Sequence, residues 1–145
     1  MAKKPAAFSR DSDLTGLWSG EYWYGGAGIP TPFTAHFVEA EGSLTGTTLE
    51  PNTFADPGLV ELSASLRGSR SDLSLRFVKL YDQAPGVHQR PIHYIGAIDP
   101  NFTMIDGEWS FGGGFSHSGR FVLMRISRGS RAEVVERAEK VVLQR

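Results

Sequence analysis

A histidine, a lysine and a tyrosine occupy positions from which they could share one chemical site. Lys79 and Tyr94 lie in short apolar runs, and His117 follows three glycines in GGGFSHS, residues 112–118. Histidine exchanges protons near neutral pH, whereas lysine and tyrosine can protonate or polarise a bound oxygen. His117, Tyr94 and Lys79 are therefore our candidate catalytic residues, for proton transfer on an apolar substrate.

Metal chemistry receives less support from the remaining histidines. His36, His88 and His93 show no recognised ligand spacing, and the chain contains no cysteine. The lack of cysteine also excludes disulfides and cysteine nucleophiles. We expect His36 and His93 to face outward and His88 to lie in a polar loop, with no metal and no cofactor bound. The weaker alternative is a metal site that joins His88, His93 and His117.

Short strand-like runs must position these groups. The runs cover residues 15–24, 31–40, 43–49, 60–67, 72–80, 91–99, 103–110 and 118–127. Turn-forming stretches separate them, in a chain with seventeen glycines and eight prolines. Regular short strands with no helical pattern among them are typical of an antiparallel sandwich or barrel.

The connections between these runs alternate strictly between short and long. In an up-and-down antiparallel barrel, alternate connections fall at opposite ends. The longer connections cover residues 25–31, 50–59, 82–90 and 112–118. We therefore predict an all-β fold, a single eight-stranded antiparallel up-and-down β-barrel with four loops around one mouth. A barrel of this size can hold one small ligand.

Alternation along each run assigns side chains to the barrel interior. Trp18 lies on the inner face of the first run, whereas Trp23 points outward. In the run 91–99 both faces are apolar, and we favour Ile92 and Tyr94 inward. The predicted ligand-binding residues are Tyr22, Tyr24, Phe33, Phe77, Tyr81, Tyr94, Trp109, Phe111 and Phe115. Aromatic walls of this kind are usual in small-molecule pockets.

Two segments resemble the opening strands of avidin and streptavidin: LTGLW at 14–18 and GSLTGTT at 42–48. More broadly, Gly16-Leu17-Trp18 is similar to the Gly-x-Trp signature of the calycin superfamily, which includes the lipocalins. In that superfamily a basic residue near the end of the last strand packs across this tryptophan and closes the barrel floor. Arg125, in FVLMRIS, is in the matching position. The resemblance implies structural roles for Trp18 and Arg125.

The biotin site of the avidins does not carry over to this chain. The avidin asparagine two positions after the tryptophan falls on Gly20, and the tyrosine that ends the second segment falls on Thr48. No asparagine or aspartate lies beside Phe121, where the last strand would supply one. The resemblance thus implies a barrel without biotin binding, and a fold alone supplies no function.

Length and charge exclude several classes of protein. The chain has 145 residues, 21% of them charged, and a formal net charge of −1. Such a length suits one domain, and near-neutrality offers no basic surface for nucleic acid or anionic lipid. The N-terminal residues lack the apolar segment of a secretory signal, and no apolar run approaches membrane-spanning length. We expect a cytoplasmic protein without nucleic-acid or membrane partners.

Two segments flank the predicted barrel at 13–128. Residues 1–12 read as a flexible lead-in. Residues 130–144 place valines on one face at helical spacing, and Ser130 with Glu133 forms a capping box. We expect a C-terminal amphipathic helix that packs on the barrel or on a second subunit, which is compatible with a homodimer.

Three functions stay open at this point. The sequence favours binding of a small, largely apolar or aromatic molecule inside the barrel. The first alternative is a cofactor-independent isomerase, lyase or cyclase that uses His117 and its neighbours as acid–base groups. The second is a filled barrel that acts as a protein-interaction module through the helix and Trp23.

Overall fold

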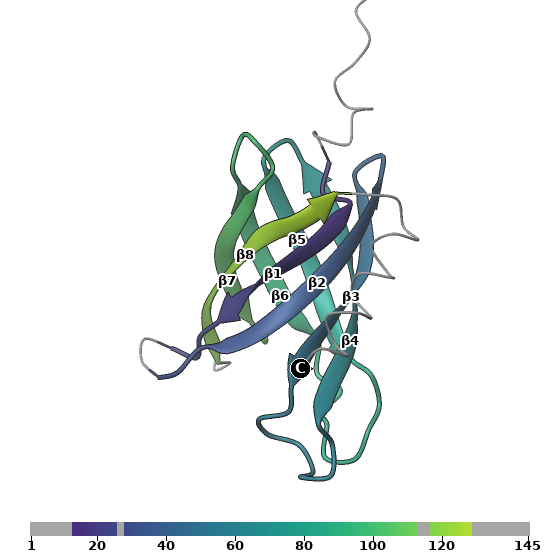
Figure 1. Ribbon diagram of the computed structural model, residues 1–145, viewed down its shortest axis with the longest axis vertical. Helices are drawn as coiled ribbons and strands as arrows, with labels where there is room; N and C mark the ends of the chain where they lie inside the picture. Colours follow the sequence, from purple (N-terminus) through teal and green to yellow (C-terminus); the bar gives the residue numbers. More distant parts are fainter. Residues whose placement is uncertain (1–12, 26–27, 113–116, 129–145) are drawn as a thin grey trace, which may run out of the picture.

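Eight antiparallel strands close into a barrel (Figure 1). The computed structural model describes residues 13–25, 28–112 and 117–128. The strands are β1 (Gly16–Tyr22), β2 (Thr31–Ala40), β3 (Ser43–Pro51), β4 (Glu61–Ser71), β5 (Ser74–Tyr81), β6 (Ile92–Ile98), β7 (Met104–Ser110) and β8 (Ser118–Arg128). Each strand pairs with the next along the chain, and β8 returns to β1. The predicted eight-stranded antiparallel barrel is confirmed.

The flanking segments are not part of this description. The predicted lead-in at 1–12 and the predicted helix at 130–144 lie outside the described residues. All regular elements within the described ranges are strands, so no helix there is long and apolar enough to cross a membrane.

Tight turns and long loops lie at opposite ends of the barrel, as the alternation of connection lengths predicts. Two residues each join β2 to β3 and β4 to β5, whereas residues 52–60 and 82–91 form the loops after β3 and β5. In Figure 1 the tight turns are at the top and these two loops hang at the bottom. We call the end with the long loops the mouth and the other end the floor.

Side chains fill the barrel from the floor upward. In β5 and β6 buried and exposed residues alternate without exception, which confirms the inward assignment of Ile92 and Tyr94. The ring of Tyr94 stacks on Phe77 with centroids 4.6 Å apart and 9° between the planes. A Cβ on Gly68, which pairs with Phe77, would overlap that residue. The close approach therefore requires glycine there.

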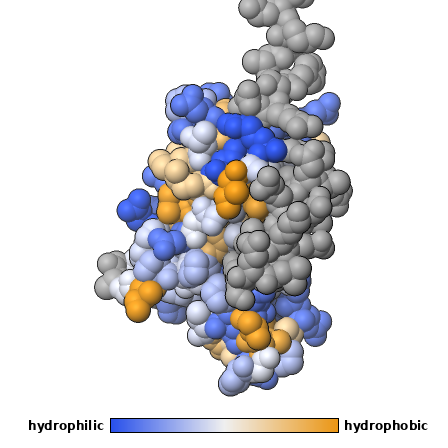
Figure 2. Space-filling view, in the orientation of Figure 1, coloured by the Kyte–Doolittle hydropathy of each residue, from blue (hydrophilic) through white to orange (hydrophobic). Residues whose placement is uncertain are grey.

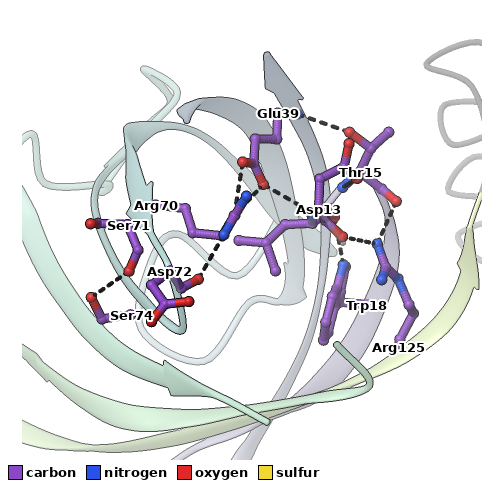
Figure 3. Close-up of polar contacts among 10 residues, drawn as sticks. Asp13, Thr15, Trp18, Glu39, Arg70, Ser71, Asp72, Ser74 and Arg125 are labelled. Atoms are coloured by element: carbon purple, nitrogen blue, oxygen red, sulfur yellow. Dashed lines mark hydrogen bonds and ion pairs between the residues drawn. The ribbon is translucent and has the colours of Figure 1, made fainter. Parts of the chain in front are cut away.

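The floor is closed by Trp18 and Arg125 (Figure 3). The Arg125 guanidinium lies 4.8 Å from the Trp18 ring centroid and donates hydrogen bonds to the carbonyls of Asp13, Thr15 and Phe102. The indole Nε1–H of Trp18 donates to the carbonyl of Leu14, 3.0 Å away. These bonds tie the chain segment before β1 to the last strand, so the barrel opens at the mouth alone.

An ion pair strengthens the same end. Nε of Arg70 lies 2.8 Å from both carboxylate oxygens of Glu39 (Figure 3). Glu39 also accepts a hydrogen bond from the backbone N–H of Leu14. These contacts join β2, the end of β4 and the segment before β1 at the floor.

Candidate functional site

A fully buried ion pair lies inside the barrel near its mouth. Lys79 Nζ in β5 is 2.6 Å from Glu50 Oε1 in β3, and neither side chain is exposed to solvent. Taking two charges out of water costs several kcal/mol per ion, and an apolar pair of the same volume is often as stable. The pair is therefore unusual in an interior that is otherwise built of apolar and aromatic side chains.

Two phenols complete the shell of the carboxylate. The hydroxyls of Tyr22 in β1 and Tyr81 in β5 donate to Glu50 Oε2, at 2.6 and 2.9 Å. Inward alternation of β1, β3 and β5 brings these groups together. The strand between β3 and β5 carries Ala64 opposite Tyr81, and this small side chain leaves room for the contact. Three donors thus surround the Glu50 carboxylate.

Aromatic rings surround the ammonium group. Lys79 Nζ lies 4.7 Å from the ring centroid of Tyr81 and between 5.2 and 5.8 Å from those of Tyr22, Phe33 and Tyr94. Cation–π attraction is strongest where water is excluded, so these rings offset part of the desolvation cost.

Burial and charge fix the protonation states of this cluster. Burial raises the pKa values of the Tyr22 and Tyr81 hydroxyls, and the Glu50 carboxylate raises them further. Burial lowers the pKa of Lys79, but Tyr94 and Glu50 more than offset this, so its pKa lies above the usual value. At neutral pH the phenols of Tyr22 and Tyr81 are therefore neutral, and Lys79 is an ammonium.

An aromatic cavity lies directly above the cluster, at the mouth. Its volume is about 10 Å³, enough for one water molecule. Its lining residues are Tyr22, Tyr24, Tyr81, His88, Ile92, Tyr94, Trp109 and Phe111. Three of these phenols touch the ion pair, so the cavity has aromatic walls and a polar base.

The rim of the cavity is formed by side chains from the long loops. The imidazole of His88 stacks on Phe54, and the Arg90 guanidinium lies 4.3 Å from the Phe111 ring centroid. Tyr24 and Phe54 remain 46% and 40% exposed. Figure 2 shows apolar residues, in orange, among polar ones at this lower end of the barrel. Exposed rings around a hollow are typical of a binding surface.

His88 is neutral and already engaged. Burial, followed by the charge of Arg90, lowers the pKa of its imidazole. Its Nδ1 accepts a hydrogen bond from the backbone N–H of Arg90 at 3.2 Å, so in the neutral ring Nε2 carries the proton. His88 therefore offers the mouth a hydrogen-bond donor and an aromatic face.

The structure gathers most of the predicted ligand-binding residues at the mouth. Tyr22, Tyr24, Tyr81, Tyr94, Trp109 and Phe111 line the cavity. Phe33 and Phe77 lie deeper, packed against Tyr22 and Tyr94 respectively, because they are one or two inward positions farther from the mouth end of their strands. Phe115 lies outside the described residues.

The candidate catalytic residues are distributed differently. Tyr94 and Lys79 meet inside the barrel, but Lys79 does not extend to the rim, because Glu50 holds its ammonium in the interior. His117 is exposed and reaches only the edge of the Phe111 ring, with centroids 6.3 Å apart. It is not among the residues that line the cavity.

Three residues of the site were not among the predicted ligand-binding residues: Glu50, Ile92, which was predicted only to face inward, and His88, which was named only in the alternative metal site. Glu50 was placed in a loop, yet it continues the inward series Leu44, Gly46 and Thr48, and β3 extends to Pro51. Continuing the alternation of inward residues along β3 by one more step would have identified Glu50. No sequence pattern distinguishes His88, because its position depends on how the loop folds over the mouth.

A larger hollow, of about 190 Å³, lies on the outer wall of β4, β5 and β6. Arg67, Arg76 and His93 are among its lining residues. The charged and imidazole side chains in its lining are exposed, so it is a weaker candidate than the mouth. Within the described ranges, no three metal-ligating side chains come together.

The mouth therefore has to be interpreted on its own geometry. No protein-family model and no curated protein matches this chain.

Proposed function

We propose that the protein binds a small, neutral, largely aromatic molecule in the mouth of its barrel. The observation that carries this proposal is the buried Glu50–Lys79 pair, with its phenols, directly beneath an aromatic cavity. Aromatic walls with a few placed polar groups are the usual composition of a ligand pocket. The calycin-like sequence segments support the same reading, since proteins of that superfamily are similar barrels that hold small molecules.

The position of the ion pair argues against a purely structural barrel. Near the floor, the rings of Trp18 and Phe37 are fully buried without any charged partner inside the barrel comparable to this pair. A charged pair in the same barrel gives no stability that an apolar pair would lack. Perturbed titratable groups beside a cavity are more often found at functional sites. We therefore assign the pair to ligand recognition.

The arrangement favours binding over proton transfer. A catalytic base needs an accessible lone pair within hydrogen-bond reach of the substrate. Glu50 is occupied by three donors, and Nδ1 of His88 accepts a backbone N–H. His117 lies at the exposed edge. The enzymatic alternative thus lacks a base among the described mouth residues.

A ligand larger than water must displace side chains at the rim. Phe54, His88 and Phe111 come from loops rather than from strands, and loops open at lower cost than a barrel wall. Their ring-to-ring contacts, at 5.4 to 5.6 Å, are replaceable by contacts with an aromatic ligand. Entry therefore leaves the β-barrel itself unchanged.

The experiment is a saturation-transfer NMR screen of neutral aromatic fragments against the full chain. Trp109→Ala, which removes a wall of the cavity, is expected to weaken the hits at least tenfold. Ile95→Ala is the control, because Ile95 is 57% exposed and lines the outer hollow instead. Failure of all fragments to bind, or equal weakening by Ile95→Ala, would contradict a ligand site at the mouth.

A further inference from the structure

Exposed apolar side chains are unevenly distributed over the outer wall of the barrel. Among the described strand residues, the exposed large hydrophobic side chains are Val78, Leu80, Ile95, Met104, Met124 and Ile126. All six lie on β5–β8, and the described outer faces of β1–β4 carry none. Single apolar residues on a surface need no explanation, whereas a set confined to one side of a molecule is typical of an interaction surface.

Ile95 is the most exposed of these six residues, and it borders a groove. It lines the hollow of about 190 Å³ on the wall of β4, β5 and β6, and also a second hollow of about 100 Å³. The two hollows share Ser69, Arg76 and Ile95, so they are parts of one groove. Val78 adds a second apolar side chain to its lining. The groove therefore has room beside Ile95 for an apolar side chain of another molecule.

The register of the strands places opposite charges on the two sides of Ile95. Arg76 in β5 is paired with Ile95 in β6, and Ile95 is paired with Glu108 in β7. Directly paired residues point to the same face of a sheet, and all three side chains are exposed. Neither Arg76 nor Glu108 has an ion-pair partner within the described residues. The row therefore presents a positive charge, an apolar centre and a negative charge to the solvent.

We propose that this wall is the interface of a homodimer whose two-fold axis runs along β6. Such an axis lies in the interface and exchanges the two sides of the row, so that Arg76 faces the partner's Glu108 and Glu108 faces the partner's Arg76. Ile95 then packs against the partner's Ile95, which enters the groove. An axis across the strands would instead oppose the Arg76 side chains of the two copies, which like-charge repulsion disfavours. Charge complementarity thus selects a second copy of this chain as the partner and fixes its orientation.

The surrounding charges are compatible with this arrangement. An axis along β6 places each of them opposite a serine. The opposed pairs are Asp106 and the partner's Ser74, Arg120 and the partner's Ser69, and Arg67 and the partner's Ser118. No two of these arginines therefore face each other across the interface, and Asp106 faces no carboxylate.

The interface is small, because the outer wall of a barrel is convex and only the strands next to β6 can meet. Interfaces that bury less than about 1,200 Å² are usually weak and transient. We therefore expect a dimer at about 500 μM and a monomer at about 5 μM, the concentration of an unfolding assay.

The test is sedimentation velocity of the full chain between about 5 and 500 μM. Ile95→Asp places a charge at the apolar centre, and it should weaken the dimer at least tenfold. Thr45→Asp is the matched control, because Thr45 is an exposed β-branched residue on β3, outside the proposed interface; it should change the dissociation constant less than about twofold. Circular dichroism establishes that each variant is folded.

Charge reversal tests the orientation of the two copies. Arg76→Glu and Glu108→Arg each oppose like charges at both ends of the row, so each variant alone should dimerise at least tenfold more weakly than the parent. An equal mixture of the two variants should regain dimerisation, since every contact in the mixed dimer then joins opposite charges. A parent that stays monomeric at about 500 μM would overturn the proposal. So would an Ile95→Asp variant that dimerises as well as the parent, because the contact would then lie elsewhere, or a mixture no more dimeric than its components.

Discussion

The substitution Glu50→Gln tests the buried ion pair most directly. Glutamine keeps the shape of the side chain and can still accept hydrogen bonds from Tyr22 and Tyr81, but it removes the negative charge. The Lys79 ammonium, which is fully buried and 2.6 Å from Glu50, would then have no counter-charge. Removing one partner of a buried pair costs about 3–5 kcal/mol. At roughly 4 °C per kcal/mol for a chain of this length, the Tm should fall by roughly 12–20 °C.

The double variant Glu50→Gln/Lys79→Met separates the charge from the packing. Because it removes both charges, most of the lost stability should return, and its cost should be well below the sum of the two single costs. The assay is thermal and urea unfolding, followed by circular dichroism, of the parent, both single variants and the double variant. Glu108→Gln is the control, because Glu108 is an exposed glutamate and should change stability by less than about 0.5 kcal/mol.

Two results would refute this reasoning. A Glu50→Gln variant that melts within about 3 °C of the parent would show that the ammonium is not an uncompensated buried charge. Strict additivity in the double variant would show that the two charges do not interact. The double variant should also bind aromatic fragments less well than the parent, although it is folded, if the pair serves recognition.

The remaining predictions concern the floor, the pH dependence and the wall. Arg125→Ala loses hydrogen bonds to three carbonyls, so it should destabilise the fold by about 2–4 kcal/mol in urea unfolding. Ligand affinity at the mouth, the opposite end of the barrel, should be nearly unchanged. If the variant and the parent had the same Tm, closure of the floor by Arg125 would be disproved. The raised pKa values of Tyr22, Tyr81 and Lys79 favour the protonated forms in the folded state. The stability that these groups contribute is therefore fully present below their unfolded-state pKa values, near pH 10, and is lost as the pH rises above them. If circular dichroism showed no loss of stability from pH 9 to about 12, this prediction would be contradicted. Gly107→Ala places a Cβ against the backbone of β6, so it should lower the Tm by several degrees or prevent folding. An unchanged Tm would show that β6 and β7 can move apart at this position.

The barrel was predictable because its signal is repeated along the chain. Inward and outward residues alternate in eight runs, and short and long connections alternate between them, so few topologies are possible. An error of one or two residues at a strand boundary does not change the predicted topology. The inward assignment of Tyr94 needed only the alternation of buried and exposed residues along β6. The contact of Arg125 with Trp18 was implied by the resemblance of Gly16-Leu17-Trp18 to the calycin signature.

The chemistry of the site was less predictable, because it depends on boundaries and loops. Pro51 follows Glu50, and proline near a glutamate reads as the start of a loop. Proline is tolerated at the end of a strand, so β3 includes Glu50 and turns it inward. His88 was expected in a polar loop, but that loop folds back over the mouth, where Phe54 and Phe111 contact its ring. Such long-range packing leaves no periodic pattern in the sequence.

Closure of the barrel has a consequence for the order of events during synthesis. β1 pairs with β8, and the bonds from Arg125 to Thr15 and Asp13 join residues 110 and 112 positions apart. The hydrogen-bonding edge of β1 therefore stays unpaired on the growing chain until the last strand has left the ribosome. Contacts of such long range form slowly, and exposed edges favour association between chains. Production of this protein should accordingly be sensitive to temperature and chaperone supply, even though the completed barrel leaves no edge exposed.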